Sequence, residues 1–324
     1  MALAQQPRPR RSGPNRSGLW GPKLAPYLFI SPFFILFLVF GLFPTLFSFY
    51  LSFQTWEQTS GLGTMAFNGL ENYTFTLLQD DWFWRSVVNT LILGVFGLLI
   101  QPIAIVLAFA IQTSLKRFAP FVTALYFLPY ITSSVAVALV FSMVFSRDAG
   151  LLNAGLAALN GVPLLGALIP DTNVNWLGNP ATIKPAVALV VLWRYLGWNV
   201  LLILSRMQAI PGDLYEAARV DGATTRQQFW HITLPQLRSM IFFTVTLTII
   251  GQMQLFDEPF ILIGNEGGVA QSGLTVAMYL YNTAFEYGDM GTASAIAWIL
   301  FAFMLVLSIL NNRVFGAGAR ARGD

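Results

Sequence analysis

Few side chains in this 324-residue sequence are of types that do chemistry, and those present exclude most catalytic sites. With one histidine, His231, and no cysteine, neither a histidine-cluster metal site nor a thiolate site can form. Asp80 and Asp81 look like paired carboxylates, but they fall in a short polar segment, and we interpret them as solvated. We expect no catalytic and no metal site. The remaining candidates are Arg194, within a long apolar stretch, and the carboxylate of Glu216 in a polar segment.

The sequence also contains no phosphate-binding loop of the form G-x-x-x-x-G-K-[ST] and no nucleophile elbow. The chain therefore cannot hydrolyse ATP by itself in the manner of P-loop proteins. We expect a protein that is not an enzyme and that binds no cofactor of its own.

The composition indicates a membrane protein. Hydrophobic residues make up 56% of the chain and charged residues only 10%, whereas a soluble domain carries roughly 25% charged residues. Such a chain has too little polar surface to cover a soluble core. It is also far too apolar to be disordered. A soluble enzyme and a disordered protein are both excluded.

Six apolar stretches are long enough to cross a membrane, for which about 20 residues are needed. They are Tyr27–Phe53, Val87–Gln112, Pro120–Phe145, Pro185–Leu204, Met240–Ile263 and Ala293–Leu310. The first is too long and too bulky for a cleavable signal peptide. The predicted fold class is therefore all-α: a polytopic membrane protein with six transmembrane helices in residues 27–313.

Basic residues predict the orientation. Most of the 18 Lys and Arg residues fall in segments that an even number of spans places on one side of the membrane. Because basic residues are enriched in cytoplasmic loops, we expect both termini in the cytoplasm of an inner (plasma) cell membrane protein. Residues 1–26, rich in Pro and Arg, are expected to be a disordered basic tail near anionic headgroups, and residues 314–324 a cytoplasmic C-terminal tail.

The longest internal polar segment, residues 210–237, lies on this same predicted side. Gly222 divides it into two short helices, with a threonine just after it as the cap of the second. Its small residues would let another protein approach closely, and Glu216 and Asp221 would place carboxylates beside Arg or Lys of that partner. The alternative interpretation is an ordinary loop.

The spacing in this segment resembles the coupling motif of binding-protein-dependent ABC importer permeases, E-A-A-x-x-D-G-A followed further on by L-P. The matching residues are Glu216, Ala217, Ala218, Asp221, Gly222, Ala223, Leu234 and Pro235. The string FNGLENY at 67–73 is similar to the F-x-G-L-x-N-Y string of sugar permeases. One departure is EGGV at 266–269, where many relatives have Gly-Gly-Pro. The resemblance extends from Tyr27 to Arg313 and is closest to the maltose-type carbohydrate uptake family, first permease subunit.

This resemblance implies a type I ABC importer permease fold and half of a translocation pathway for a di- or oligosaccharide. It implies four kinds of protein and lipid partner: a second homologous permease subunit, two ATP-binding subunits that dock on residues 210–237, an extracytoplasmic sugar-binding protein, and membrane lipids. ATP and Mg would be bound by the partner ATPase subunits. No nucleic acid partner is expected.

Polar and aromatic residues of the fourth and fifth predicted spans are candidates for the cargo pathway. An ionisable group at membrane depth is a functional candidate by default, and Arg194 lies about halfway along its span. Aromatic faces suit the CH surfaces of a sugar, and amides or carboxylates suit its hydroxyls. The predicted pathway residues are Arg194, Trp198, Asn199, Gln252, Phe256 and Asp257. Arg194 has a second interpretation, as a structural partner of Asp257 or of the other permease subunit.

Two other functions fit parts of the sequence. A permease for glycerol-3-phosphate or another polar solute would use Arg194 to hold a phosphate. An ion-coupled secondary transporter would need coupling-ion residues at mid-depth and would leave residues 210–237 without a purpose. Sugar import with ATPase partners is therefore the main prediction.

Overall fold

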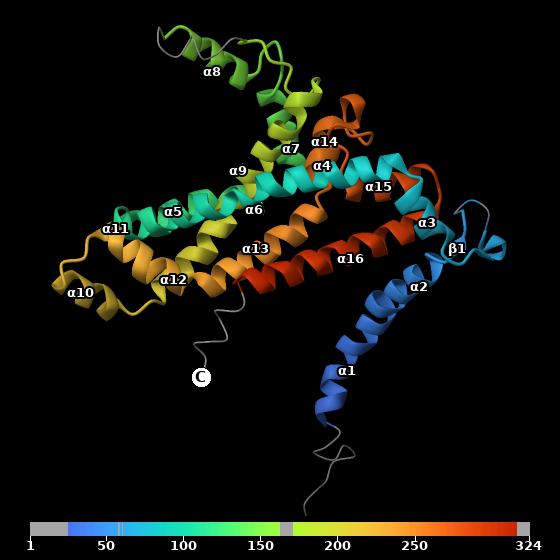
Figure 1. Cartoon of the computed structure of the whole chain (residues 1–324), viewed down its shortest axis with the longest axis horizontal. Helices are drawn as coiled ribbons and strands as arrows, with labels where there is room; N and C mark the ends of the chain where they lie inside the picture. The colour runs from blue at the N-terminus through green and yellow to red at the C-terminus, as the bar shows by residue number, and fades with distance from the viewer. Residues whose placement is uncertain (1–24, 58, 60, 163–170, 316–324) are drawn as a thin grey trace, which may run out of the picture. The chain divides into compact units, whose positions relative to one another are not determined.

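The computed structural model describes residues 25–57, 59, 61–162 and 171–315, and these are overwhelmingly helical (Figure 1). The predicted tails, residues 1–26 and 314–324, lie almost wholly outside the described residues. The chain forms two compact units that divide between Tyr50 and Leu51.

The first unit is one apolar helical stretch. It comprises α1 (Ala25–Phe37), a π-helical turn η1 (Leu38–Leu42) and α2 (Phe43–Leu51). Phe33 stacks on Phe37, and Phe43 on Phe47, at the one-turn spacing that brings side chains together along a helix. Most side chains between residues 26 and 50 are exposed, including most of the aromatic ones.

The second unit contains the other long apolar helices. They are α4 (Asp81–Leu98), α5 (Ile100–Thr113), α6 (Ala119–Ile131), α7 (Ser134–Val144), α9 (Pro180–Gln208), α13 (Arg238–Met253), α14 (Asp257–Ile263) and α16 (Met290–Phe315). Including the first unit, the described residues hold five stretches long and apolar enough to cross a membrane, or six if a bent pair counts as one.

That bent pair is the predicted third span, which is not a straight helix. The stretch ends as α6 at Ile131 and resumes as α7 at Ser134, and the two parts meet at 96°. Thr132 and Ser133 between them have extended backbone angles. The fifth predicted span is interrupted as well, because Gln254 and Phe256 leave the helical conformation between α13 and α14.

Short elements connect these helices. They are β1 (Gln54–Thr55), η3 (Leu62–Thr64), β2 (Ala66–Phe67), α3 (Glu71–Leu78), η4 (Lys116–Phe118), α8 (Leu151–Asn160), α10 (Gly212–Val220), α11 (Thr225–Gln228), η6 (Phe229–Thr233), α12 (Leu234–Gln236), η7 (Val269–Gln271), α15 (Val276–Tyr281) and η8 (Asn282–Glu286). The strands β1 and β2 pair antiparallel. The prediction of two short helices divided at Gly222 is confirmed: α10 and α11 flank Gly222, whose φ is +80°, and Thr224 caps α11 together with Gln227.

The prediction that Asp80 is solvated is wrong. Its carboxylate is buried and caps α4 by accepting bonds from the backbone N–H groups of Trp82 and Phe83 at 3.0 and 3.1 Å. It also accepts a 2.6 Å hydrogen bond from the hydroxyl of Tyr279, far along the chain. A helix N-terminus offers unpaired donors, and this carboxylate satisfies two of them. Asp81, next to it, is exposed as predicted.

The core of the second unit is divided along α9, which packs on several neighbouring helices (Figure 1). Buried residues of α9 between Ile183 and Val191 form one cluster with α4, α7 and α14. Those between Val200 and Met207 form another with α5 and with Leu237. A third cluster joins α4, α13, α15 and α16. The segment of α9 between the first two clusters carries Arg194, Trp198 and Asn199.

Candidate functional site

A pocket of about 330 Å³ opens between α6, α9 and α13, at the level where α9 passes from one hydrophobic cluster to the next. It is lined by Ile100, Tyr130, Tyr195, Trp198, Asn199, Leu247, Thr248, Gly251, Gln252 and Leu255. Three of the six predicted pathway residues, Trp198, Asn199 and Gln252, lie together here. All of the lining residues are uncharged.

Aromatic rings form one wall of this pocket. Tyr130 of α6 stacks on Trp198 with ring centres 4.8 Å apart and planes 17° apart, and it meets Tyr195 edge-on at 5.9 Å. The helices carrying these rings approach closely because residue 197 is glycine: any Cβ there would collide with the backbone carbonyl of Tyr126. The result is a flat apolar face, which suits the CH surface of a sugar ring.

A buried hydrogen-bond network centred on Gln101 ties three helices together beneath this wall. The Gln101 amide donates to Asn199 Oδ1 at 3.0 Å and to Thr248 Oγ1 at 2.9 Å. Its carbonyl accepts from the hydroxyl of Thr244 at 2.8 Å. The Asn199 amide in turn donates to the carbonyl of Tyr195 at 3.0 Å. Because the Thr248 oxygen accepts from Gln101, its own O–H remains available to donate elsewhere.

Gln252 is held differently. Its side chain packs over Gly97, where a Cβ would come within 2.5 Å of the Gln252 amide carbon. Its Oε1 is buried and has no hydrogen-bond partner among the described residues. A buried amide oxygen without a donor is costly, and a donor from a bound molecule would relieve that cost once the side chain turned toward the pocket.

Arg194 lies one helical turn from Trp198 but is not a lining residue. It forms an ion pair with Glu258, whose side chain is only 2% exposed. A second guanidinium nitrogen is 3.4 Å from the backbone carbonyl of Thr132, at the break between α6 and α7. The carboxylate paired with Arg194 is thus Glu258 rather than its neighbour Asp257.

The other two predicted pathway residues also lie away from the pocket. Asp257 accepts a 2.9 Å hydrogen bond from the hydroxyl of Ser134, the first residue of α7. Phe256 stacks on Phe260 and lies beside Tyr281, with ring centres 4.8 and 5.2 Å apart. The break after α13 turns these two residues out of the face that Gln252 shares with the pocket.

Sequence reasoning missed Tyr130, Tyr195, Thr248 and Gln101. Gln101 carried a signal, since it is an uncharged polar residue inside an apolar stretch, where such groups seek partners on other helices. The sequence gives no such signal for Tyr130, because the direction of its side chain depends on where α6 ends.

The 210–237 loop presents the eight predicted coupling residues in two ways. Glu216, Ala217, Asp221, Gly222 and Pro235 are exposed, while Ala218, Ala223 and Leu234 are partly buried. The ends of α10 and α11 are joined tightly, because the Ala223 N–H donates to the carbonyl of Ala218 at 2.8 Å. Glu216 lies 3.7 Å from Arg219, but both side chains are more than 60% exposed, so the carboxylate remains open to a partner.

The same loop is anchored to the long helices at its far end. Phe229 packs edge-on against Phe109 of α5 with ring centres 4.7 Å apart. Tyr215 of α10 shares a 3.0 Å hydrogen bond with Thr233, which is buried. Phe229 and Leu234 pack against the cluster of α5 and the last turns of α9. These contacts join the loop directly to α5 and to the last turns of α9.

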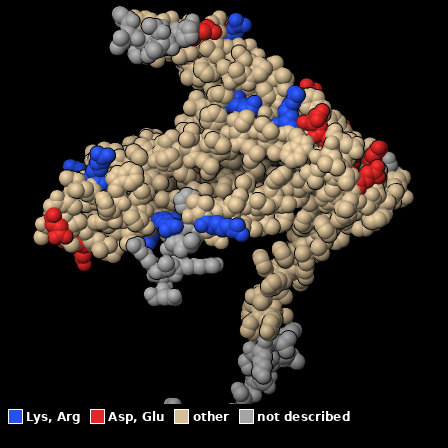
Figure 2. Space-filling view, viewed as in Figure 1, with Lys and Arg blue, Asp and Glu red and all other residues tan. Residues whose placement is uncertain are grey.

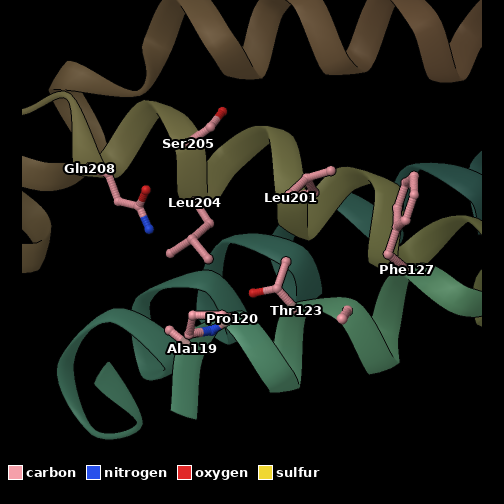
Figure 3. Close-up of a pocket in the computed structure, with 9 residues that line it drawn as sticks. Ala119, Pro120, Thr123, Phe127, Leu201, Leu204, Ser205 and Gln208 are labelled. Carbon is pink, nitrogen blue, oxygen red and sulfur yellow. The ribbon is translucent and has the colours of Figure 1, made fainter. Parts of the chain in front are cut away.

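A second pocket, of about 380 Å³, lies between the first turns of α6 and the last turns of α9 (Figure 3). It is mainly apolar, with Thr123, Ser205 and Gln208 as its polar members. None of the predicted pathway residues lines it. On the face in view, Figure 2 shows charged side chains gathered near the ends of the long helices, with uncharged surface between them.

Comparison with known proteins agrees with this architecture. Residues 101–317 match the family described as "Binding-protein-dependent transport system inner membrane component". The chain is 33% identical to the arabinooligosaccharides transport system permease protein AraP of Bacillus subtilis, over 93% of this chain and 92% of that protein. It is 32% identical to the lactose transport system permease protein LacF of Rhizobium radiobacter, over 88% of this chain and 92% of that protein.

The fold is that of a solved permease. A chain of a bacterial ABC transporter involved in the import of the acidic polysaccharide alginate superposes with a TM-score of 0.76, at 23% identity, over 93% of this chain and 97% of that one. The predicted fold class is confirmed by this likeness and by the helical spans. From the family match and the two relatives, this chain belongs to the binding-protein-dependent transport system inner membrane components.

Proposed function

We propose that this chain is a permease subunit of an ATP-driven sugar importer and that the pocket of Tyr130, Trp198 and Asn199 is its share of the cargo pathway. The observation that carries the proposal is the composition of that pocket: a stacked aromatic wall beside amide and hydroxyl groups, with uncharged lining throughout. Such a surface binds a neutral di- or oligosaccharide by ring stacking and hydroxyl contacts. AraP and LacF, both named for sugar transport, support the same cargo class.

The 210–237 loop is the proposed docking site for ATPase subunits. Its exposed carboxylates and small residues suit a basic, closely approaching partner, and its anchored end would carry movement into α5 and α9. The remaining proposed partners are a second permease, an extracytoplasmic sugar-binding protein and membrane lipids. Both termini are proposed to lie in the cytoplasm with this loop. The chain itself would perform no covalent step; ATP and Mg would be bound by the partner subunits.

Arg194 does not favour a phosphate cargo. Its guanidinium is already bound to the carboxylate of Glu258 and lies outside the lining of the pocket. A phosphate would have to displace a buried carboxylate to reach it. The uncharged pocket therefore supports a neutral sugar over glycerol-3-phosphate.

Replacing both Trp198 and Asn199 by Ala tests the pocket. We expect sugar uptake and binding-protein-stimulated ATP hydrolysis to fall at least tenfold. Assembly with the partner subunits should be kept, and so should the affinity of the separate binding protein for its sugar. Uptake should be compared for arabinotriose, lactose and glycerol-3-phosphate.

Trp193→Ala is the matched control. Trp193 is on the same helix but borders a different hollow and is 44% exposed. Its loss should leave transport near the level of the unmodified chain. If the double variant transports normally, the cargo does not pass through this pocket. Uptake of glycerol-3-phosphate alone would overturn the proposed sugar cargo.

A further inference from the structure

Arg194 and Glu258, which lie outside the lining of the proposed cargo pocket, are paired with each other, and a neighbouring carboxylate is not part of that pair. Arg194 is bound to Glu258, and both side chains are largely withdrawn from solvent, 13% and 2% exposed. Asp257, next in sequence to Glu258, is bound to Ser134 and not to the arginine. Glu258 is therefore the carboxylate that occupies the guanidinium of Arg194.

Arg194 is close to the pocket although it does not line it. It lies one helical turn from Trp198, and its guanidinium carbon lies 5.4 Å from the ring centre of Tyr195, which is a lining residue. The Nε atom is buried and has no hydrogen-bond partner among the described residues. An arginine with donor capacity to spare beside a pocket attracts carboxylates and sulfonates, because its fork of N–H groups matches their oxygens.

We infer that Glu258 is a specificity-determining residue: by holding Arg194, it keeps the pocket selective for uncharged sugars and against sugar acids. This inference rests on the proposed sugar cargo. While the ion pair is intact, the charge of Arg194 is neutralised by Glu258, and an anionic cargo gains no ion pair with the guanidinium. When Glu258 loses its charge, the cation of Arg194 is no longer neutralised and can turn toward a carboxylate in the pocket. Specificity is a difference between two affinities, and withholding the guanidinium lowers the affinity for the anion alone.

The test compares lactose with lactobionate, the acid in which the reducing-end carbon of lactose is oxidised to a carboxylate. Binding of each is measured to the complete permease–ATPase complex in nanodiscs, with the binding protein left out so that its own selectivity plays no part. Glu258→Gln is the informative variant, because glutamine keeps the shape and one acceptor oxygen. We expect the affinity for lactobionate relative to lactose to rise at least tenfold.

Asp257→Asn is the matched control. It removes the same charge at the neighbouring position but leaves Arg194 bound to Glu258, so the affinity ratio should change less than threefold. An equal rise in both variants would show a general effect of charge and would overturn the role of the ion pair. An unchanged ratio in an assembled Glu258→Gln complex would overturn it too.

A third variant covers the case in which Glu258→Gln fails to assemble. Replacing Glu258 by Asp keeps the charge but shortens the side chain, so the close contact with Arg194 is lost; the ratio should still rise, by a smaller factor. If it does not rise, the inference fails. If the unmodified complex binds neither sugar and the Glu258→Gln complex binds lactobionate alone, the proposed neutral sugar cargo is contradicted while the role of Glu258 stands.

Discussion

Gln101 shows how much one uncharged side chain can organise at membrane depth. Both its amide and its carbonyl are used, and the three partners belong to α9 and α13. In an apolar surrounding each of these groups would otherwise lack a partner, at a cost of about 1–3 kcal/mol. The network therefore fixes which atoms of Asn199 and Thr248 face the pocket.

Replacing Gln101 by Met, which has a similar length, should lower the stability of the assembled complex by about 1–3 kcal/mol. Thr248→Val should cost less, and the double variant should cost less than the sum of the two, with a coupling energy on the order of 1 kcal/mol. Denaturation of the three variants in nanodiscs measures the cycle. Strictly additive losses would show that the two side chains do not interact.

Tyr279 gives a prediction on pH. Burial, together with the hydrogen bond to the carboxylate of Asp80, raises the pKa of the Tyr279 hydroxyl above its usual range. In the unfolded chain this hydroxyl titrates near about pH 10. The stability contribution is thus fully present below about pH 10 and is lost as pH rises from there through the higher pKa of the folded state.

Tyr279→Phe should lower stability by about 1–2 kcal/mol at pH 7.5, since it removes a hydrogen bond to a charged acceptor. The variant should also lose less stability than the unmodified chain when the pH rises above about 10. Thermal unfolding at pH 7.5 and pH 10.5 measures both effects. A variant as stable as the parent at pH 7.5 would contradict this role of the hydroxyl.

At the scale of elements, the exposed surface of α10 carries the proposed contact with an ATPase. Glu216→Lys should reduce uptake at least tenfold without preventing insertion, because a reversed charge would oppose a basic partner. The measurement is transport together with pull-down of the ATPase subunit. Asp213→Lys is a suitable control, since Asp213 is exposed on the same helix but lies outside the coupling motif. Normal uptake with a normally bound ATPase would refute the assignment.

The sequence predicted which segments form helices better than it predicted the directions of the helix axes and of the side chains. The long apolar helices and the division at Gly222 follow from hydrophobic runs and from a residue that adopts positive φ, which are local properties. The 96° bend after Ile131 could not be predicted, because a straight span and a broken span have equally apolar sequences. The pairing of Arg194 with Glu258 rather than Asp257 depends on where α14 begins, as does the position of Phe256.

At the scale of the whole molecule, the first helical stretch is strongly apolar, and most of its aromatic side chains are exposed. We expect purification to yield a complex with a second permease and ATPase subunits, and the chain expressed alone to be unstable or inactive. Size-exclusion chromatography and uptake in proteoliposomes decide this. A monodisperse preparation of this chain alone that transported sugar without ATP would contradict the expectation.

The unbroken length of α9 has a consequence for the order in which the molecule loosens. This helix runs through 29 residues, about 44 Å, whereas two of its neighbouring stretches, α6–α7 and α13–α14, are interrupted at Thr132–Ser133 and near Leu255. Amide hydrogens exchange with solvent only when their segment opens locally, and the least stable segments open first. The slowest exchange should therefore occur along α9 at Val187–Val191 and Val200–Leu204. Amide hydrogens at the helix interruptions should exchange sooner, so that the shorter helices open while α9 remains folded.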